Sequence, residues 1–459
     1  MSSPFMTPLE RRAAISLAGI FSLRMLGLFM ILPVFALYAE HLQGVTPFLI
    51  GLAIGIYGLT QALLQIPFGM LSDRIGRKPV IAGGLLIFAL GSVVAAYAGT
   101  IEGVILGRAL QGAGAIAAAV MALTADLTAE EHRTKAMAVI GMSIGLSFML
   151  AMIAGPLLNR WIGVPGIFAL TAVLALLGVV VLYTLVPKPT RSVFHRDAEV
   201  EPAQFRPVLR NPQLLRLDWG IMVLHLALTA SFVVLPQALV QSGLDAAHHW
   251  QLYLPVMLLG ILLIFPFIII AEKKRRMKLV FSVAVALLMC TQLGLVWGLG
   301  NFWSIALLLQ LFFIAFNLLE ATLPSLVSKV APAQSKGTAM GVYTSSQFIG
   351  AFIGGAAGGW LQGRFGSEAV FVFTALLVAL WWLLALTMRE PPYLSSEMFR
   401  VGVRGAAAAQ RLEQELGLIT GVAQASVNVD DGVAYLKVDS RELDRDSLAR
   451  VIGVNTEKE

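Results

Sequence analysis

The chain has 459 residues, of which 58% are apolar and only 13% are charged. A soluble protein carries about a quarter charged residues, so the composition excludes a large soluble enzyme, and its hydrophobicity excludes a disordered chain. The net charge of +6 would suggest a nucleic-acid partner in a soluble protein, but residues 1–399 carry +8 and residues 400–459 carry −2. We therefore expect a membrane part without a nucleic-acid partner, followed by a small soluble domain.

Twelve apolar segments are long enough to cross a bilayer core of roughly 30 Å as helices of about 20 residues. Only helices and closed barrels satisfy their backbone groups in lipid, and continuous apolar runs of this length are helices. The predicted fold is an all-α membrane protein with twelve transmembrane helices. The expected spans are residues 15–39, 48–71, 79–99, 101–125, 135–157, 163–187, 214–241, 249–271, 278–299, 301–327, 336–362 and 367–388.

A proline-rich, charged segment at residues 188–213 divides the spans into two six-helix halves, residues 1–187 and 214–390. The beginnings of the fifth and eleventh spans, residues 135–138 and 338–341, are similar to each other. Paired six-helix halves with a binding site between them are a recurrent transporter plan. We expect this plan here.

Basic residues in the loops predict the orientation of the chain. If the amino terminus is cytoplasmic, 21 lysines and arginines fall on the cytoplasmic side and only Arg160 and Arg364 fall on the other. The protein is therefore expected in a bacterial inner membrane, in contact with lipid, with both termini in the cytoplasm.

The composition changes after Pro391, where a linker at residues 391–399 leads to a cytoplasmic domain at residues 400–459. The pattern predicts a small ferredoxin-like α+β domain. The domain has no Cys or His, so no metal site is expected there, and a contact with the basic loops 188–216 or 273–278, or dimerisation, is expected instead. The expected elements are strands at residues 399–404, 422–429 and 433–438 and helices at residues 406–416 and 441–451.

An ordered string of glycines and charges follows the second span. Its glycines allow a sharp turn and close helix approach, and its charges at the membrane surface can hold the end of another helix. The string is Gly69-Met70-Leu71-Ser72-Asp73-Arg74-Ile75-Gly76-Arg77-Lys78.

This string resembles the signature loop of the major facilitator superfamily, and the resemblance extends along all twelve spans. Two further strings resemble the drug:proton antiporter branch of that family: Leu26-Gly27 with Pro33-Val34 in the first span, and Arg108-Ala109-Leu110-Gln111-Gly112-Ala113-Gly114 in the fourth.

The fifth span ends in Gly155-Pro156, which resembles the antiporter motif only in part. The family has a pair of glycines where this chain has Asn159 and Arg160, and a glycine where it has Ala151. These differences weaken the prediction of export, but they do not affect the resemblance to the superfamily.

The resemblance implies roles at the cytoplasmic face. Asp73 is expected to meet the amino end of the eleventh span, residues 336–341 with Gly337 and Gly341, and so to lock the two halves together. Arg77 is expected to pair with Asp126, whose protonation would loosen the lock. Glu320 is expected in the same lock with Arg77.

Ionisable residues inside a membrane are functional candidates. Arg24, Arg108 and His225 lie deep in their spans, and Asn317 pairs with Glu320 on one helix face. Arg108 also shares a face with Gln111 and Gly112. These residues are candidates for the substrate or proton path, although the arginines could instead pin neighbouring helices through carbonyl oxygens, and His225 could be a packing donor.

The leading hypothesis is a proton-driven transporter that exports a small, partly apolar compound by alternating access. A proton-symport importer and a transporter-like sensor that signals through the tail stay open as alternatives. The chain lacks a nucleotide-binding loop, so no enzyme activity and no cofactor is expected.

Overall fold

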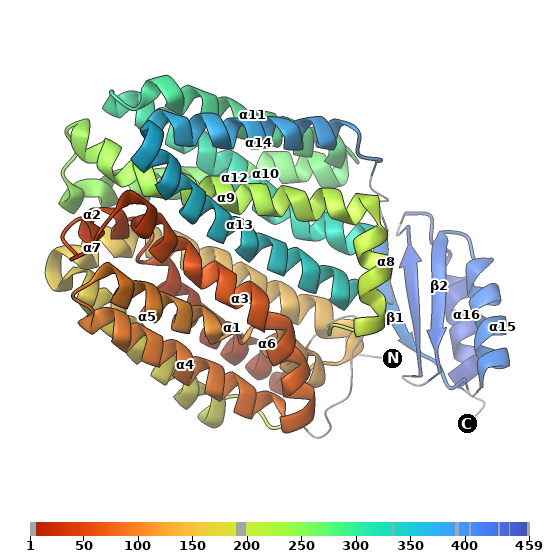
Figure 1. The fold of residues 1–459 in the computed structure, drawn as a ribbon. Coiled ribbons are helices and arrows are strands. Elements are labelled where there is room, and N and C mark those ends of the chain that lie inside the picture. The colour runs from red at the N-terminus through yellow and green to blue at the C-terminus, as the bar shows by residue number, and fades with distance from the viewer. Residues whose placement is uncertain are drawn as a thin grey trace.

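The computed structural model describes residues 6–189, 199–332, 335–390, 394–403, 405–429, 432–439 and 441–456. Long helices run side by side as one bundle, and a small domain with a β-sheet lies at one end of it (Figure 1). We call the end that carries this domain the tail end and the opposite end the far end.

Breaks at glycine and proline shape the first half of the bundle. The expected first span is divided around Pro33, which has no N–H to donate, and the fourth is divided after Gly114. The predicted fifth and sixth spans are joined in one long helix, which bends at Gly163, where φ is +66°. The helices are α1 (Pro8–Phe29), α2 (Phe35–Ala39), α3 (Pro47–Ile75), α4 (Arg77–Tyr97), α5 (Ile101–Ala113), α6 (Ala117–Asp126) and α7 (Glu130–Thr184).

The segment predicted as a linker at residues 188–213 contains local structure. It includes a short 3-10 turn, η1 (Pro202–Gln204), and helix α8 (Phe205–Arg210). The second half follows with α9 (Pro212–Gln241), η2 (Ala246–His248), α10 (His249–Lys273), α11 (Met277–Gly298), α12 (Phe302–Val330), α13 (Lys336–Phe365) and α14 (Ser367–Leu386).

Within the described residues, ten helices are long and apolar enough to cross a membrane. The long helix α7 counts once among them despite its bend at Gly163, and the glycine-rich α13 is not among them. The chain is therefore a multi-pass membrane protein, and the finer number of twelve crossings stays a prediction.

The two halves meet along α3 and α13, where glycines replace side chains. A Cβ on Gly51 would overlap the carbonyl oxygen of Gly355, and one on Gly58 would overlap that of Phe348. Small residues allow the backbones of membrane helices to approach this closely. The contact lies in the part of both helices that is nearer the far end.

The tail forms an antiparallel three-stranded sheet in the order β1-β3-β2, with two helices packed on it. Its own core contains Leu412, Leu416, Leu436 and Val438. The predicted position of the first strand, residues 399–404, was wrong. β1 begins earlier in the chain and pairs with β3 along its whole length. The second helix also starts later than expected. The elements are β1 (Ser395–Arg400), α15 (Ala406–Gly417), β2 (Val422–Asn428), β3 (Val433–Val438) and α16 (Arg445–Thr456).

Candidate functional site

Arg77 is the centre of an ion-pair cluster at the tail end. Gly76, with φ of +97°, ends α3 and begins α4, and this turn directs the Arg77 guanidinium back under α3. The guanidinium is buried and pairs with Asp73, with Asp126 at 3.3 Å and with Glu199 at 2.7 Å. One cation therefore holds carboxylates from α3, from α6 and from the segment that links the halves.

The expected contact between Asp73 and the amino end of α13 is absent from the described part of the chain. Asp73 pairs with Arg77, and the linker occupies the amino end of α13 instead. A Cβ on Gly337 would overlap the Glu199 backbone, and the Thr338 hydroxyl accepts a hydrogen bond from the Glu201 N–H at 3.0 Å. In this structure the linker, and not Asp73, therefore contacts the amino end of α13.

The other residues of the loop stabilise the same corner of the bundle. Lys78 Nζ donates hydrogen bonds to the carbonyl oxygens of Leu182 and Val186, at the end of α7. Gly69 allows α3 to pack against Ala118 of α6, and Arg74 is exposed.

Arg24 is completely buried inside the first half. Its Nη2 donates to Gln61 Oε1 at 2.7 Å and to the carbonyl oxygen of Gly114 at 3.1 Å. The guanidinium also lies 5.3 Å from the Phe88 ring centre and 5.8 Å from that of Tyr57. These contacts join α1 to α3, α4 and the break between α5 and α6.

Arg108 joins α5 to α3. Its Nε and Nη2 atoms each donate, at 3.3 Å, to a backbone carbonyl oxygen, of Ala53 and of Ile54 respectively, and Nη1 donates to Gln111 Oε1 at 2.8 Å. A Cβ on Gly112 would overlap the Tyr57 backbone, so this glycine allows the close approach. These contacts hold α5 against α3, as expected from the alternative in which Arg108 joins neighbouring helices through carbonyl oxygens.

His225, Glu320 and Gln347 form a polar cluster in the second half, between α9, α12 and α13. His225 Nε2 lies 3.1 Å from Glu320 Oε2 and 2.8 Å from Gln347 Nε2. Gln347 Nε2 also reaches Glu320 Oε1 at 3.4 Å. The expected place of Glu320 beside Arg77 was wrong, because the structure directs this carboxylate into its own half.

Further polar groups surround this cluster. Asp218 on α9 and Tyr343 on α13 are also buried in this half. Asn317 lies one helical turn from Glu320, and its amide approaches the position that a Cβ on Gly260 would take. The cluster itself therefore combines a carboxylate, an imidazole and an amide within one half.

Gly155 and Pro156 of the fifth-span motif lie inside α7. A Cβ on Gly155 would overlap the carbonyl oxygen of Met30 and touch Pro33, so this glycine packs against the break between α1 and α2. The Gly155-Pro156 fragment of the fifth span therefore packs against Pro33, which belongs to the antiporter-like string of the first span.

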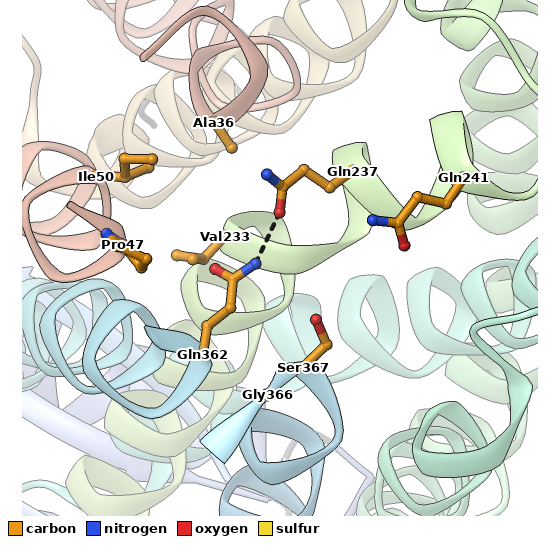
Figure 2. Close-up of a pocket in the computed structure, with 9 residues that line it drawn as sticks. All are labelled: Ala36, Pro47, Ile50, Val233, Gln237, Gln241, Gln362, Gly366 and Ser367. Atoms are coloured by element: carbon orange, nitrogen blue, oxygen red, sulfur yellow. Dashed lines mark hydrogen bonds between the residues drawn. The ribbon is translucent and has the colours of Figure 1, made fainter. Parts of the chain in front are cut away.

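A pocket of about 320 Å³ opens at the far end, between the two halves (Figure 2). Gln362 Nε2 donates to Gln237 Oε1 at 2.8 Å, and Gln237 in turn donates to Glu40, so a polar chain crosses from α13 and α9 to the first half. The lining residues are Ala36, Pro47, Ile50, Val233, Gln237, Gln241, Gln362, Gly366 and Ser367.

The tail domain binds the ends of α10 and α12. Arg275 Nη2 donates to both carboxylate oxygens of Asp439 at 2.7 and 2.8 Å, which lowers the pKa of that carboxyl. Lys437 Nζ donates to the carbonyl oxygens of Lys329 and Ala331 at 2.7 and 2.5 Å. Burial, with repulsion from Lys336, lowers the pKa of Lys437 to about 8.

Sequence reasoning missed Glu199 and Lys437. Neither lies in a motif, and only the fold brings the linker to α13 or the tail sheet to α12. In the described ranges, no group of three or more His, Cys, Asp or Glu side chains is arranged so that it could hold a metal ion.

Comparison with known proteins gives the following likenesses. The Major Facilitator Superfamily profile matches residues 17–355. The chain is 49% identical to the inner membrane transport protein YajR of Escherichia coli over 447 residues, which cover 97% of this chain and 98% of YajR. It is 27% identical to the multidrug resistance protein MdtH of Aeromonas salmonicida, over 73% of this chain and 84% of MdtH.

Among solved structures, the D-xylose–proton symporter is similar in fold. The TM-score is 0.67 at 14% sequence identity, and the match covers 82% of this chain and 98% of the symporter.

Proposed function

Because the chain belongs to the Major Facilitator Superfamily, and is thus a transporter and not an enzyme, we propose that it is a proton-coupled exporter of a small, partly apolar compound. It works by alternating access in the inner membrane, driven by the proton gradient without a cofactor. Both termini lie in the cytoplasm, so the tail end is the cytoplasmic end. The His225–Glu320 pair carries this proposal.

The pair has the chemistry of a proton-binding site. Histidine is the side chain whose unperturbed charge changes near neutral pH, and a carboxylate 3.1 Å away accepts or shares its proton. Ionisable groups within a membrane are expensive and serve ion or proton movement. The two residues come from α9 and α12, so protonation changes the attraction between two helices of the second half.

Gln347 connects the pair to α13, the helix that packs on α3 of the first half. A change of charge at His225 and Glu320 therefore acts on the helix that forms the contact between the halves.

Twelve crossings complete the proposed topology. The bend at Gly163 divides α7 into two crossings, and α13, 30 residues long, is a further one whose glycines lower its hydropathy. The tail is a ferredoxin-like module, whose full pattern has one strand more. Its role is regulatory, through its contact with α10 and α12, or dimerisation.

Export is favoured by the Gly155-Pro156 motif fragment and by the likeness to a protein named for multidrug resistance. Proton symport into the cell is the second candidate, because Asn159 and Arg160 replace the glycines that the antiporter motif has.

Purified protein in lipid vesicles with an imposed pH gradient, tested with a panel of small compounds, separates these functions. Gradient-driven movement of a compound against the proton flow supports export, and movement with the protons supports symport. Binding of a compound without any flux would contradict both and support a sensor.

A further inference from the structure

The segment Glu199–Glu201 joins the two halves of the bundle at the tail end. On the side of the first half, Glu199 Oε1 accepts a hydrogen bond from Arg77 Nη2 at 2.7 Å. On the side of the second half, the Glu201 N–H donates to the Thr338 hydroxyl, which also lies 3.4 Å from the Glu201 carbonyl oxygen. We call these three residues the strap.

The strap is packed as tightly as a core element. Glu199 is only 6% exposed. Gly337 has no side chain, and a Cβ there would overlap the Glu199 backbone, while one on Gly341, a turn later, would touch Val200. The first turn of α13 is thus shaped to receive the strap.

The carboxylate of Glu199 brings negative charge to the Arg77 guanidinium, while the Glu199 backbone lies against Gly337 at the amino end of α13. A hydrogen bond between a buried guanidinium and a carboxylate is among the stronger ones in proteins. The strap therefore links the halves through both its side chain and its backbone.

The strap belongs to one arrangement of the halves. In this structure α3 and α13 are in contact near the far end, and their tail ends are bridged by the strap. A direct approach of the α3 end to α13 needs the space beside Gly337, which the Glu199 backbone occupies. In alternating access the tail ends close as the far end opens, and the strap fills the space beside Gly337 into which they would close.

We propose that Glu199 is a positioning residue of the transport cycle, which acts through Arg77 to hold the bundle closed at the far end. This inference deepens the proposed function, but its test needs neither a proton gradient nor a transported compound. Its failure can therefore be distinguished from a failure of that function.

The test measures the distance between spin labels at the far end of the full-length protein. The labels are placed at His41→Cys in the first half and Gly300→Cys in the second, in a Cys290→Ser background, because Cys290 is exposed. A Cβ on Gly300 meets no atom within 4 Å. Electron–electron resonance in detergent and in lipid gives the distance distribution.

Glu199→Gln is expected to add a longer far-end distance, because it weakens one link while Arg77 keeps Asp73 and Asp126. Glu199→Asp is expected to restore much of the original distribution. Thr338→Val removes the second anchor and is expected to change the distances in the same direction.

Glu272→Gln is the matched control, since that carboxylate pairs with Lys329 within the second half alone, and its distribution should equal that of the unaltered chain. Unchanged distances in both Glu199→Gln and Thr338→Val, with the protein monodisperse, would overturn the proposal.

Discussion

At the scale of single residues, Arg77 is the most constrained group of the tail end. Its guanidinium is buried and faces three carboxylates, one of which, Asp126, has a completely buried side chain. Arginine suits this place because its planar fork offers several fixed donors, whereas lysine offers one compact charge.

Arg77→Lys is therefore expected to lower the thermal stability of the purified protein, and Arg77→Gln to lower it further. Removing one partner of a buried ion pair costs about 3–5 kcal/mol, because the other charge stays buried. Unfolding followed by tryptophan fluorescence measures the shift. Arg74→Gln serves as the control, because Arg74 is exposed, and an equal loss in both variants would contradict this account of Arg77.

The pair of Arg77 with Asp126 was expected from the family resemblance, which implies an acid at the end of the fourth span as the partner of this arginine. It placed Glu320 wrongly, because one sequence does not reveal which way a helix face turns. Glu199 had no local signal at all. Its role follows from the path of the linker, which only the packed bundle determines.

At the scale of helices, the glycine-lined contact between α3 and α13 determines how closely the halves approach. Gly51, Gly55 and Gly58 on α3 each lie against backbone atoms of α13. The apolar patterns predicted helices over these residues, but they could not predict the breaks at Pro33 and Gly114, which depend on neighbouring helices.

Gly51→Ala is expected to weaken the far-end contact, because its Cβ would overlap the Gly355 carbonyl oxygen. Overpacking of this kind costs about 1–3 kcal/mol. The spin-label pair at His41 and Gly300 measures the result as a longer far-end distance. In Gly141→Ala, where a Cβ meets no atom within 4 Å, the distance should not change, and a matching increase there would refute the effect of the contact.

The tail contacts the loop after α10 through the pair of Arg275 with Asp439, in which Nη2 donates to both carboxylate oxygens. The lowered pKa of Asp439 means that its ionised form is favoured by docking. The pair therefore stabilises docking fully when the pH is above the ordinary carboxyl pKa of 3.8. This stabilisation is lost as the pH falls through the lowered pKa of Asp439.

We therefore expect the tail to loosen as the pH falls below about 4, and Asp439→Asn to loosen it already at neutral pH. Hydrogen exchange of β3 and of the α10 end measures docking. Exchanging the charges, with Arg275→Asp and Asp439→Arg together, should restore protection at neutral pH. If Asp439→Asn left the exchange unchanged, the pair would not hold the tail.

At the scale of the whole molecule, the tail and the bundle have separate apolar cores. The break in charge composition near residue 400 predicted this division, whereas the contacts of Lys437 and Asp439 with the bundle could be seen only in the fold. Arg275, in the loop at residues 273–278, pairs with Asp439 of the tail.

Deletion of residues 393–459 is expected to leave a bundle that still inserts and unfolds cooperatively, because no apolar core is divided. The unfolding midpoint should fall only slightly, since the deletion removes polar contacts at two helix ends. Membrane fractionation and thermal unfolding measure this result, and loss of insertion would show that the two parts are not separable.

The central claim is that the His225–Glu320 pair carries the coupled proton. Its most direct test is proton flux in vesicles, followed with a pH-sensitive dye when a transported compound is added. The unaltered protein should move protons in the direction opposite to the compound, and Glu320→Gln should still exchange the compound across the membrane but move no protons. Undiminished proton movement in Glu320→Gln would contradict the account.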